Sequence, residues 1–128
     1  QGEDANFTVR DETAVVVHFL NNLYEDMTAV YSDYDNALHK QFLGAYKPEE
    51  LQLKLKLGSW GSAGDKDGNN NVTAETTLEA IAMHTAAIVA RYKADVETID
   101  NPALAGWQEK LDAANSALQA ILPEVAQL

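Results

Sequence analysis

One stretch of seven residues limits the folds that are open to this chain. In "LQLKLKL", Leu51–Leu57, leucines alternate with glutamine and lysine, and a period of two predicts a β-strand with one apolar face. No other stretch shows a convincing strand pattern. A lone strand leaves its backbone N–H and C=O groups without partners. We therefore expect its partner strands to lie outside this chain, or the segment to fold otherwise. A short helical turn beginning at Pro48 is the competing interpretation for its first residues.

The chain before this stretch has the spacing of a helix. From about Asp11 to Phe42, apolar residues recur in steps of three and four, which predicts one long amphipathic helix. The residues on its predicted apolar face are Val16, Phe19, Leu20, Leu23, Met27, Val30, Tyr31, Tyr34 and Leu38.

The second half begins with a polar, glycine-rich segment, residues 58–71, which predicts a loop. Thr73 suits a helix N-cap, and the following apolar residues carry a helix to about Ile99. The Asn101-Pro102 pair then separates this helix from a last one, which we expect Pro123 to end.

Composition excludes several classes of function. The 128 residues carry 20 acidic and 9 basic side chains, a net charge of −11, which opposes binding to nucleic acid or to an anionic membrane surface. The chain has no cysteine, so disulfides, thiolate zinc sites and cysteine nucleophiles are excluded, and a cytoplasmic location is expected. Because the chain does not open with Met, Gln1 and Gly2 are interpreted as a tag remnant. Residues 3–128 then form a single helical segment.

The segment "GDKDGNNNVTAE" has part of the pattern of a calcium loop. Asp65, Asp67 and Asn69 stand at loop positions one, three and five, where oxygen ligands are needed. Position twelve is Thr76, however, and a glutamate, Glu75, comes one residue early. The preceding "GSWGSAG" is also unlike an incoming helix. A stand-alone helical module that binds calcium or a protein partner remains the alternative interpretation.

A longer segment, "LGSWGSAGDKDGNNNVTAETTLEAI", resembles a signature of the phosphoenolpyruvate carboxylase family. In that family a strand ends in Ser-Trp, and a glycine-rich turn, Gly-Asp-Arg-Asp-Gly-Asn-Pro and a helix opened by Asn-Val-Thr follow. The matching residues are Ser59, Trp60, Gly64, Asp65, Asp67, Gly68, Asn69, Asn71, Val72 and Thr73. Lys66 replaces the usual Arg, Asn70 replaces the usual Pro, and "GSAG" is about one residue longer than the family's turn. The helix "DETAVVVHFLNNLYEDM" also fits, so the resemblance covers roughly residues 11–97.

The resemblance implies a mainly α fold, with long helices and one strand, forming a portion of an α-rich α/β barrel. The family is a lyase that converts phosphoenolpyruvate and bicarbonate into oxaloacetate and phosphate with magnesium or manganese. By resemblance, Trp60 would line the carbon dioxide pocket, and an active-site loop would contain Asp65, Lys66, Asp67 and Asn69.

The family's histidine stretch, its Arg-Gly-Gly loops and its metal-binding carboxylate motifs do not occur in this sequence. We therefore expect no catalytic residue and no metal ligand in this chain, and no activity from the chain alone. The expected partners are the remainder of the enzyme chain and small-molecule substrates, and the complete enzyme is expected to be a homo-oligomer.

Overall fold

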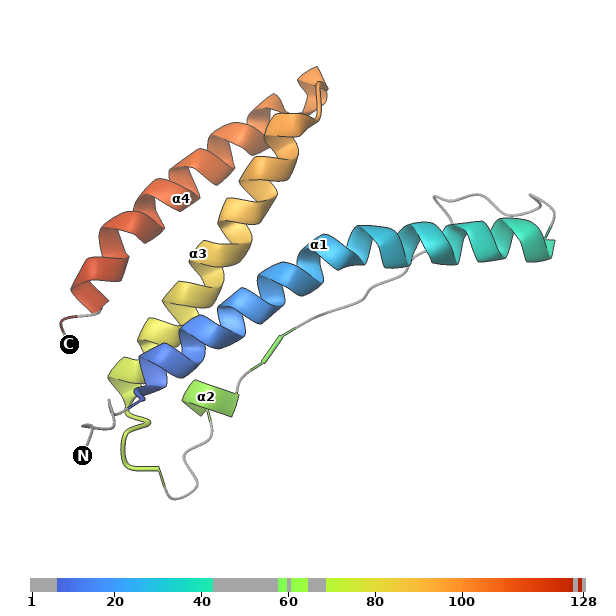
Figure 1. The fold of residues 1–128 in the computed structure, drawn as a ribbon. Coiled ribbons are helices and arrows are strands. Elements are labelled where there is room, and N and C mark those ends of the chain that lie inside the picture. Colours follow the sequence, from blue (N-terminus) through green and yellow to red (C-terminus); the bar gives the residue numbers. More distant parts are fainter. Residues whose placement is uncertain (1–6, 43–57, 60, 65–68, 126, 128) are drawn as a thin grey trace, which may run out of the picture. The chain divides into compact units, whose positions relative to one another are not determined.

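The computed structural model describes residues 7–42, 58–59, 61–64, 69–125 and 127. Its chain divides into two units, one of residues 1–17 with 59–128 and the other of residues 18–58. Helices account for 87% of the described residues, and Figure 1 shows three long ones, α1, α3 and α4. None of the described helices is long and apolar enough to cross a membrane.

Helix α1, Val9–Phe42, confirms the long amphipathic helix and begins two residues before the expected start. The reason is a cap at Thr8. The side-chain oxygen of Thr8 accepts a hydrogen bond from the Asp11 N–H at 3.1 Å, and Asp11 Oδ2 accepts one from the Thr8 N–H at 2.9 Å. This reciprocal arrangement is a capping box, and it satisfies two backbone donors that the first turn would leave unpaired.

Helix α3, Ala74–Thr98, begins and ends where its sequence predicts. Thr73 is the N-cap: Thr73 Oγ1 accepts from the Thr76 N–H at 3.3 Å, and Thr76 Oγ1 accepts from the Thr73 N–H at 2.9 Å. Ile99 is the C-cap. The capping box places Thr76, which occupies position twelve of the calcium pattern, in a structural role.

The last two elements are η2, Pro102–Leu104, and α4, Ala105–Val125. Asn101 caps η2, as its Oδ1 accepts from the Ala103 N–H at 3.0 Å. The expected end of the last helix at Pro123 is wrong by two residues, since α4 continues to Val125. A proline so close to the C-terminal end removes a single intrahelical hydrogen bond, so the final turn can still form.

The fold class needs a correction. Long helices plus one strand were expected, but all regular structure in the described part of the chain is helical, and no strand is found there. The predicted strand itself, Leu51–Leu57, lies outside the described residues. Within the predicted loop, Gly61–Gly64 form the short helix α2. A helix satisfies its backbone groups within one segment, so the described helices need no partner strands.

The core of the first unit is small and lies where the start of α1, α2 and the start of α3 meet. Val9, Ala63, Val72 and Ala80 form one buried cluster. Thr13 is buried beside it, and its hydroxyl donates to the Val9 carbonyl at 2.8 Å. Two of the four cluster members are alanines, which allow the backbones to approach closely.

Helices α3 and α4 pack side by side in antiparallel directions (Figure 1). Lys93 of α3 joins Asp112 of α4 through an ion pair of 2.6 Å. Large apolar side chains nevertheless remain exposed in this part of the chain: Leu78, Ile81, Tyr92, Ile99, Trp107 and Ile121. The α3–α4 pair therefore leaves much apolar surface uncovered.

Candidate functional site

The structure describes only part of the candidate site. Trp60, Asp65, Lys66 and Asp67 lie outside the described residues, so their expected roles stay predictions. Asn69 is described and is exposed. The backbone on both sides of the undescribed segment 65–68 is also described, and the geometry of these two flanks shows how the chain is held on either side of the segment.

Asn69 shapes the flank that leads into α3. Its Oδ1 accepts a hydrogen bond from the Asn71 N–H at 3.0 Å, and its carbonyl accepts one from the Val72 N–H at 3.2 Å. A side-chain bond to the backbone two residues on is an Asx turn, which stabilises a reversal of the chain. The reversal brings Val72 into the buried cluster and Thr73 to its capping position.

The other flank, α2, is held against the same helix. The Thr77 hydroxyl lies 2.8 Å from the carbonyl oxygen of Ala63, to which it donates. Ala63 is only 1% exposed and packs in one cluster with Val72 and Ala80. Both flanks of segment 65–68 are therefore attached to the first turns of α3.

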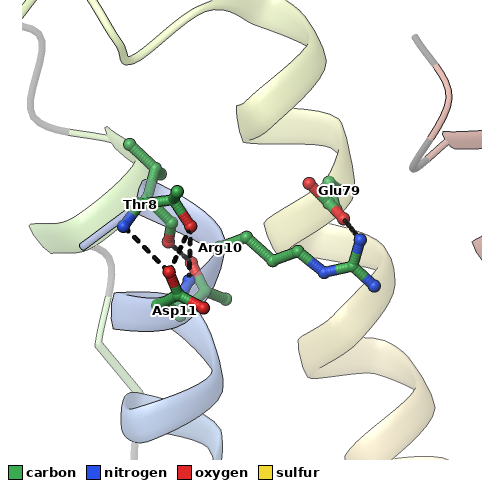
Figure 2. Close-up of polar contacts among 6 residues, drawn as sticks. Thr8, Arg10, Asp11 and Glu79 are labelled. Atoms are coloured by element: carbon green, nitrogen blue, oxygen red, sulfur yellow. Dashed lines mark hydrogen bonds and ion pairs between the residues drawn. The ribbon is translucent and has the colours of Figure 1, made fainter. Parts of the chain in front are cut away.

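An ion pair joins the start of α1 to α3 next to these flanks. Arg10 reaches across to Glu79 in Figure 2, with Nη1 3.1 Å from Oε1. The Glu79 side chain is 14% exposed and the Arg10 side chain 59%. Glu79 Oε1 is fully buried and has no well-aligned hydrogen bond in the structure, so the contact with Arg10 is mainly one of charge.

The cap of α1 lies beside this ion pair (Figure 2). Hydrogen bonds from the Thr8 hydroxyl at 2.7 Å and the Thr8 N–H at 2.9 Å stabilise the Asp11 carboxylate and lower its pKa below the ordinary value of 3.8.

Sequence reasoning missed these supporting residues. The Thr8 cap had a readable signal, since a threonine followed three residues later by an acid is a capping pattern. The contacts Arg10–Glu79 and Thr77–Ala63 had none, because their members are distant in sequence and on different elements.

The described residues do not fit a metal centre. No group of three or more histidine, aspartate and glutamate side chains in the described ranges could hold an ion. Two oxygens of the calcium pattern, Asn69 Oδ1 and Thr76 Oγ1, are engaged with backbone groups. The residues that the structure describes offer no assembled set of metal ligands.

Comparison with known proteins identifies the family. The sequence model of phosphoenolpyruvate carboxylase matches residues 3–127. The chain belongs to the phosphoenolpyruvate carboxylase family. A phosphoenolpyruvate carboxylase of Burkholderia vietnamiensis is 34% identical over 119 residues, covering 92% of this chain and 11% of the relative. The enzymes of the same name from Burkholderia mallei (strain SAVP1) and Paraburkholderia xenovorans are 36% and 35% identical over 97 residues, covering 75% of this chain and 9% of each relative.

The family match confirms the resemblance seen around Trp60 and extends it from residues 11–97 to nearly the whole chain. The chain spans about a tenth of the length of these phosphoenolpyruvate carboxylases. No solved structure matches the chain.

Proposed function

We propose that this chain is a segment of a phosphoenolpyruvate carboxylase, an enzyme that forms oxaloacetate and phosphate from phosphoenolpyruvate and bicarbonate. The observation that carries the proposal is the family match over residues 3–127, combined with relatives about ten times longer. In this proposal the chain supplies an active-site loop, while the catalytic groups come from the remainder of the enzyme.

The exposed apolar side chains support the idea of a larger enzyme. Among the described residues, the buried apolar side chains are Val9, Ala63, Val72, Ala80 and Ala82. Three of these five are alanines, whereas Leu78, Tyr92 and Trp107 are about half exposed or more. Soluble chains bury their large apolar groups because exposure to water costs about 25 cal/mol per Å². Packing against the remainder of the enzyme would remove this cost.

The proposed roles of the loop residues follow from their chemistry. A large aromatic face at Trp60 suits a pocket for carbon dioxide, which is uncharged and poorly hydrated. Asp65, Asp67 and Asn69 would orient the loop by hydrogen bonds and ion pairs. Lys66 keeps the positive charge of the family's usual arginine but loses its bidentate fork.

The metal cofactor, the location and the oligomeric state of the complete enzyme are proposed from the family as well. A magnesium or manganese ion would be held by residues outside this chain, because the family's metal-binding carboxylate motifs do not occur in its sequence. We expect the complete enzyme to be a cytoplasmic homo-oligomer.

The direct test is a chimaeric enzyme. The 119 matched residues of the Burkholderia vietnamiensis enzyme are replaced by their counterparts from this chain, and oxaloacetate is measured by coupling to malate dehydrogenase. We expect formation of oxaloacetate that requires both phosphoenolpyruvate and bicarbonate, and none from the 128-residue chain alone. A chimaera that assembles like the parent enzyme yet forms no oxaloacetate would refute the proposal, as would turnover by the isolated chain.

Two chimaera variants test the site. Trp60→Ala is expected to raise KM for bicarbonate, while Trp107→Ala, which removes a tryptophan of α4, serves as the control for loss of an indole outside the proposed pocket. Equal effects of both variants would remove Trp60 from the proposed pocket.

The spacing of Asp65, Asp67 and Asn69 favours a second candidate, a stand-alone module that binds calcium or a protein partner. Calorimetric titration of the chain with calcium separates the two. A micromolar affinity for calcium that is abolished by Asp65→Ala would favour the module. The absence of calcium binding would favour the carboxylase proposal.

A further inference from the structure

Thr77 stands at the point where α2, α3 and the flanks of the loop are joined. Its hydroxyl lies 2.8 Å from the Ala63 carbonyl oxygen and 2.9 Å from the Thr73 carbonyl oxygen. The single hydroxyl proton has to be shared between these two acceptors. The Thr73 carbonyl already accepts the N–H of Thr77 at 3.1 Å, so the bond to Ala63 is the contribution that only the hydroxyl makes.

The position of Ala63 makes this bond sensitive to change. Ala63 is 1% exposed, so water is a poor substitute for the threonine hydroxyl at its carbonyl. Ala63 also packs with Val72, which belongs to the opposite flank. Losing the hydroxyl would therefore loosen one flank of segment 65–68 while the other stays attached to α3 through its Asx turn and capping box.

We infer that Thr77 is a positioning residue of the proposed carboxylase, holding α2 on α3 so that the two flanks of the active-site loop keep a fixed separation. The inference rests on the proposed function. Thr77 does not itself touch substrate; it acts through the backbone that begins and ends the loop. Displacements of about 1 Å at remote positions can lower a rate on the order of a hundredfold.

The test uses the chimaeric enzyme, with residues numbered as in this chain. Thr77→Val keeps the shape of threonine and removes the hydroxyl, and Thr77→Ser keeps the hydroxyl. Thr85→Val is the matched control, because the Thr85 hydroxyl bonds the Ile81 carbonyl within α3. We expect Thr77→Val to lower kcat per assembled enzyme at least about tenfold, and the other two variants to stay within about threefold of the parent chimaera.

The readouts separate positioning from a general loss of stability. A residue that only supports folding would lower the amount of assembled enzyme and the Tm, with kcat per assembled enzyme and both KM values unchanged. Thr77→Ala provides a second variant without the hydroxyl if Thr77→Val does not assemble.

Equal kcat and KM values in Thr77→Val and the parent would overturn the inference and leave the proposed function standing. Similar losses in Thr77→Val and Thr85→Val would also overturn it. An inactive parent chimaera would overturn the proposed function, and the inference with it.

Discussion

The ion pair between Arg10 and Glu79 makes a strong quantitative prediction. At 3.1 Å, and with the effective dielectric constant of about 20 that suits sites near a protein surface, the attraction is roughly 5 kcal/mol before desolvation. The Glu79 carboxylate has lost most of its hydration, whereas Arg10 remains 59% exposed. Exposed pairs contribute about 0.2–1 kcal/mol, and removing one partner of a buried pair costs about 3–5 kcal/mol. We expect an intermediate loss in the free energy of unfolding of about 1.5 kcal/mol for Arg10→Met.

The two single substitutions should differ in size. Arg10→Met leaves a buried carboxylate without its cation, whereas Glu79→Gln leaves an exposed guanidinium that water can solvate. Arg10→Met should therefore be the more destabilising change, and the double variant should resemble Glu79→Gln. Urea unfolding followed by far-UV circular dichroism gives the free energies for this double-mutant cycle. A coupling energy below about 0.3 kcal/mol, or a larger loss for Glu79→Gln, would refute the reasoning.

Three further predictions concern local contacts and pH. Thr8→Ala removes the cap of α1 and should lower the Tm by about 2–5 °C. The bond from the Thr8 hydroxyl helps to lower the pKa of Asp11, so the difference in Tm should be largest above pH 3.8 and decrease as the pH falls through the folded pKa. A part of the difference should remain in acid, because Thr8 Oγ1 also accepts the Asp11 N–H, and a difference that increases in acid would contradict the assignment. Burial lowers the pKa of His84 below 6.5, so the free energy of unfolding should be highest above that pH and decrease as the pH falls toward the folded pKa. The Tm of His84→Gln should therefore change less than that of the parent between about pH 7 and pH 5. An equal change of Tm in both proteins would exclude His84 as the cause. The pKa of Lys93 is raised, chiefly by its bond to Asp112. Lys93→Met should therefore lower the Tm slightly in dilute buffer and have no effect on it in about 1 M salt. A difference in Tm between variant and parent that persists in the salt would show that packing, and not charge, is lost.

The helices could largely be predicted because their determinants are local. Steps of three and four predicted α1, and Thr73 marked the start of α3. These signals act within a few residues, through caps and one continuous apolar face. The errors at the ends, such as the helix continuing past Pro123, are also local, because one missing hydrogen bond in a last turn has little effect.

Alternation alone does not decide whether a segment forms a strand. "LQLKLKL" has the period of a strand, but a strand needs neighbours for its backbone groups, and the described part of this chain provides helices only. Whether such a segment pairs depends on residues elsewhere in the fold, which the pattern of the segment cannot contain.

The sequence by itself determined the family and the helical segments, because these depend on residue order and on contacts within a few positions. The tertiary structure decided how the chain is held on either side of segment 65–68. Thr77 meets Ala63, and Arg10 meets Glu79, only once α1, α2 and α3 are packed together, since hydrogen bonds and ion pairs form between side chains that are adjacent in space and far apart along the chain.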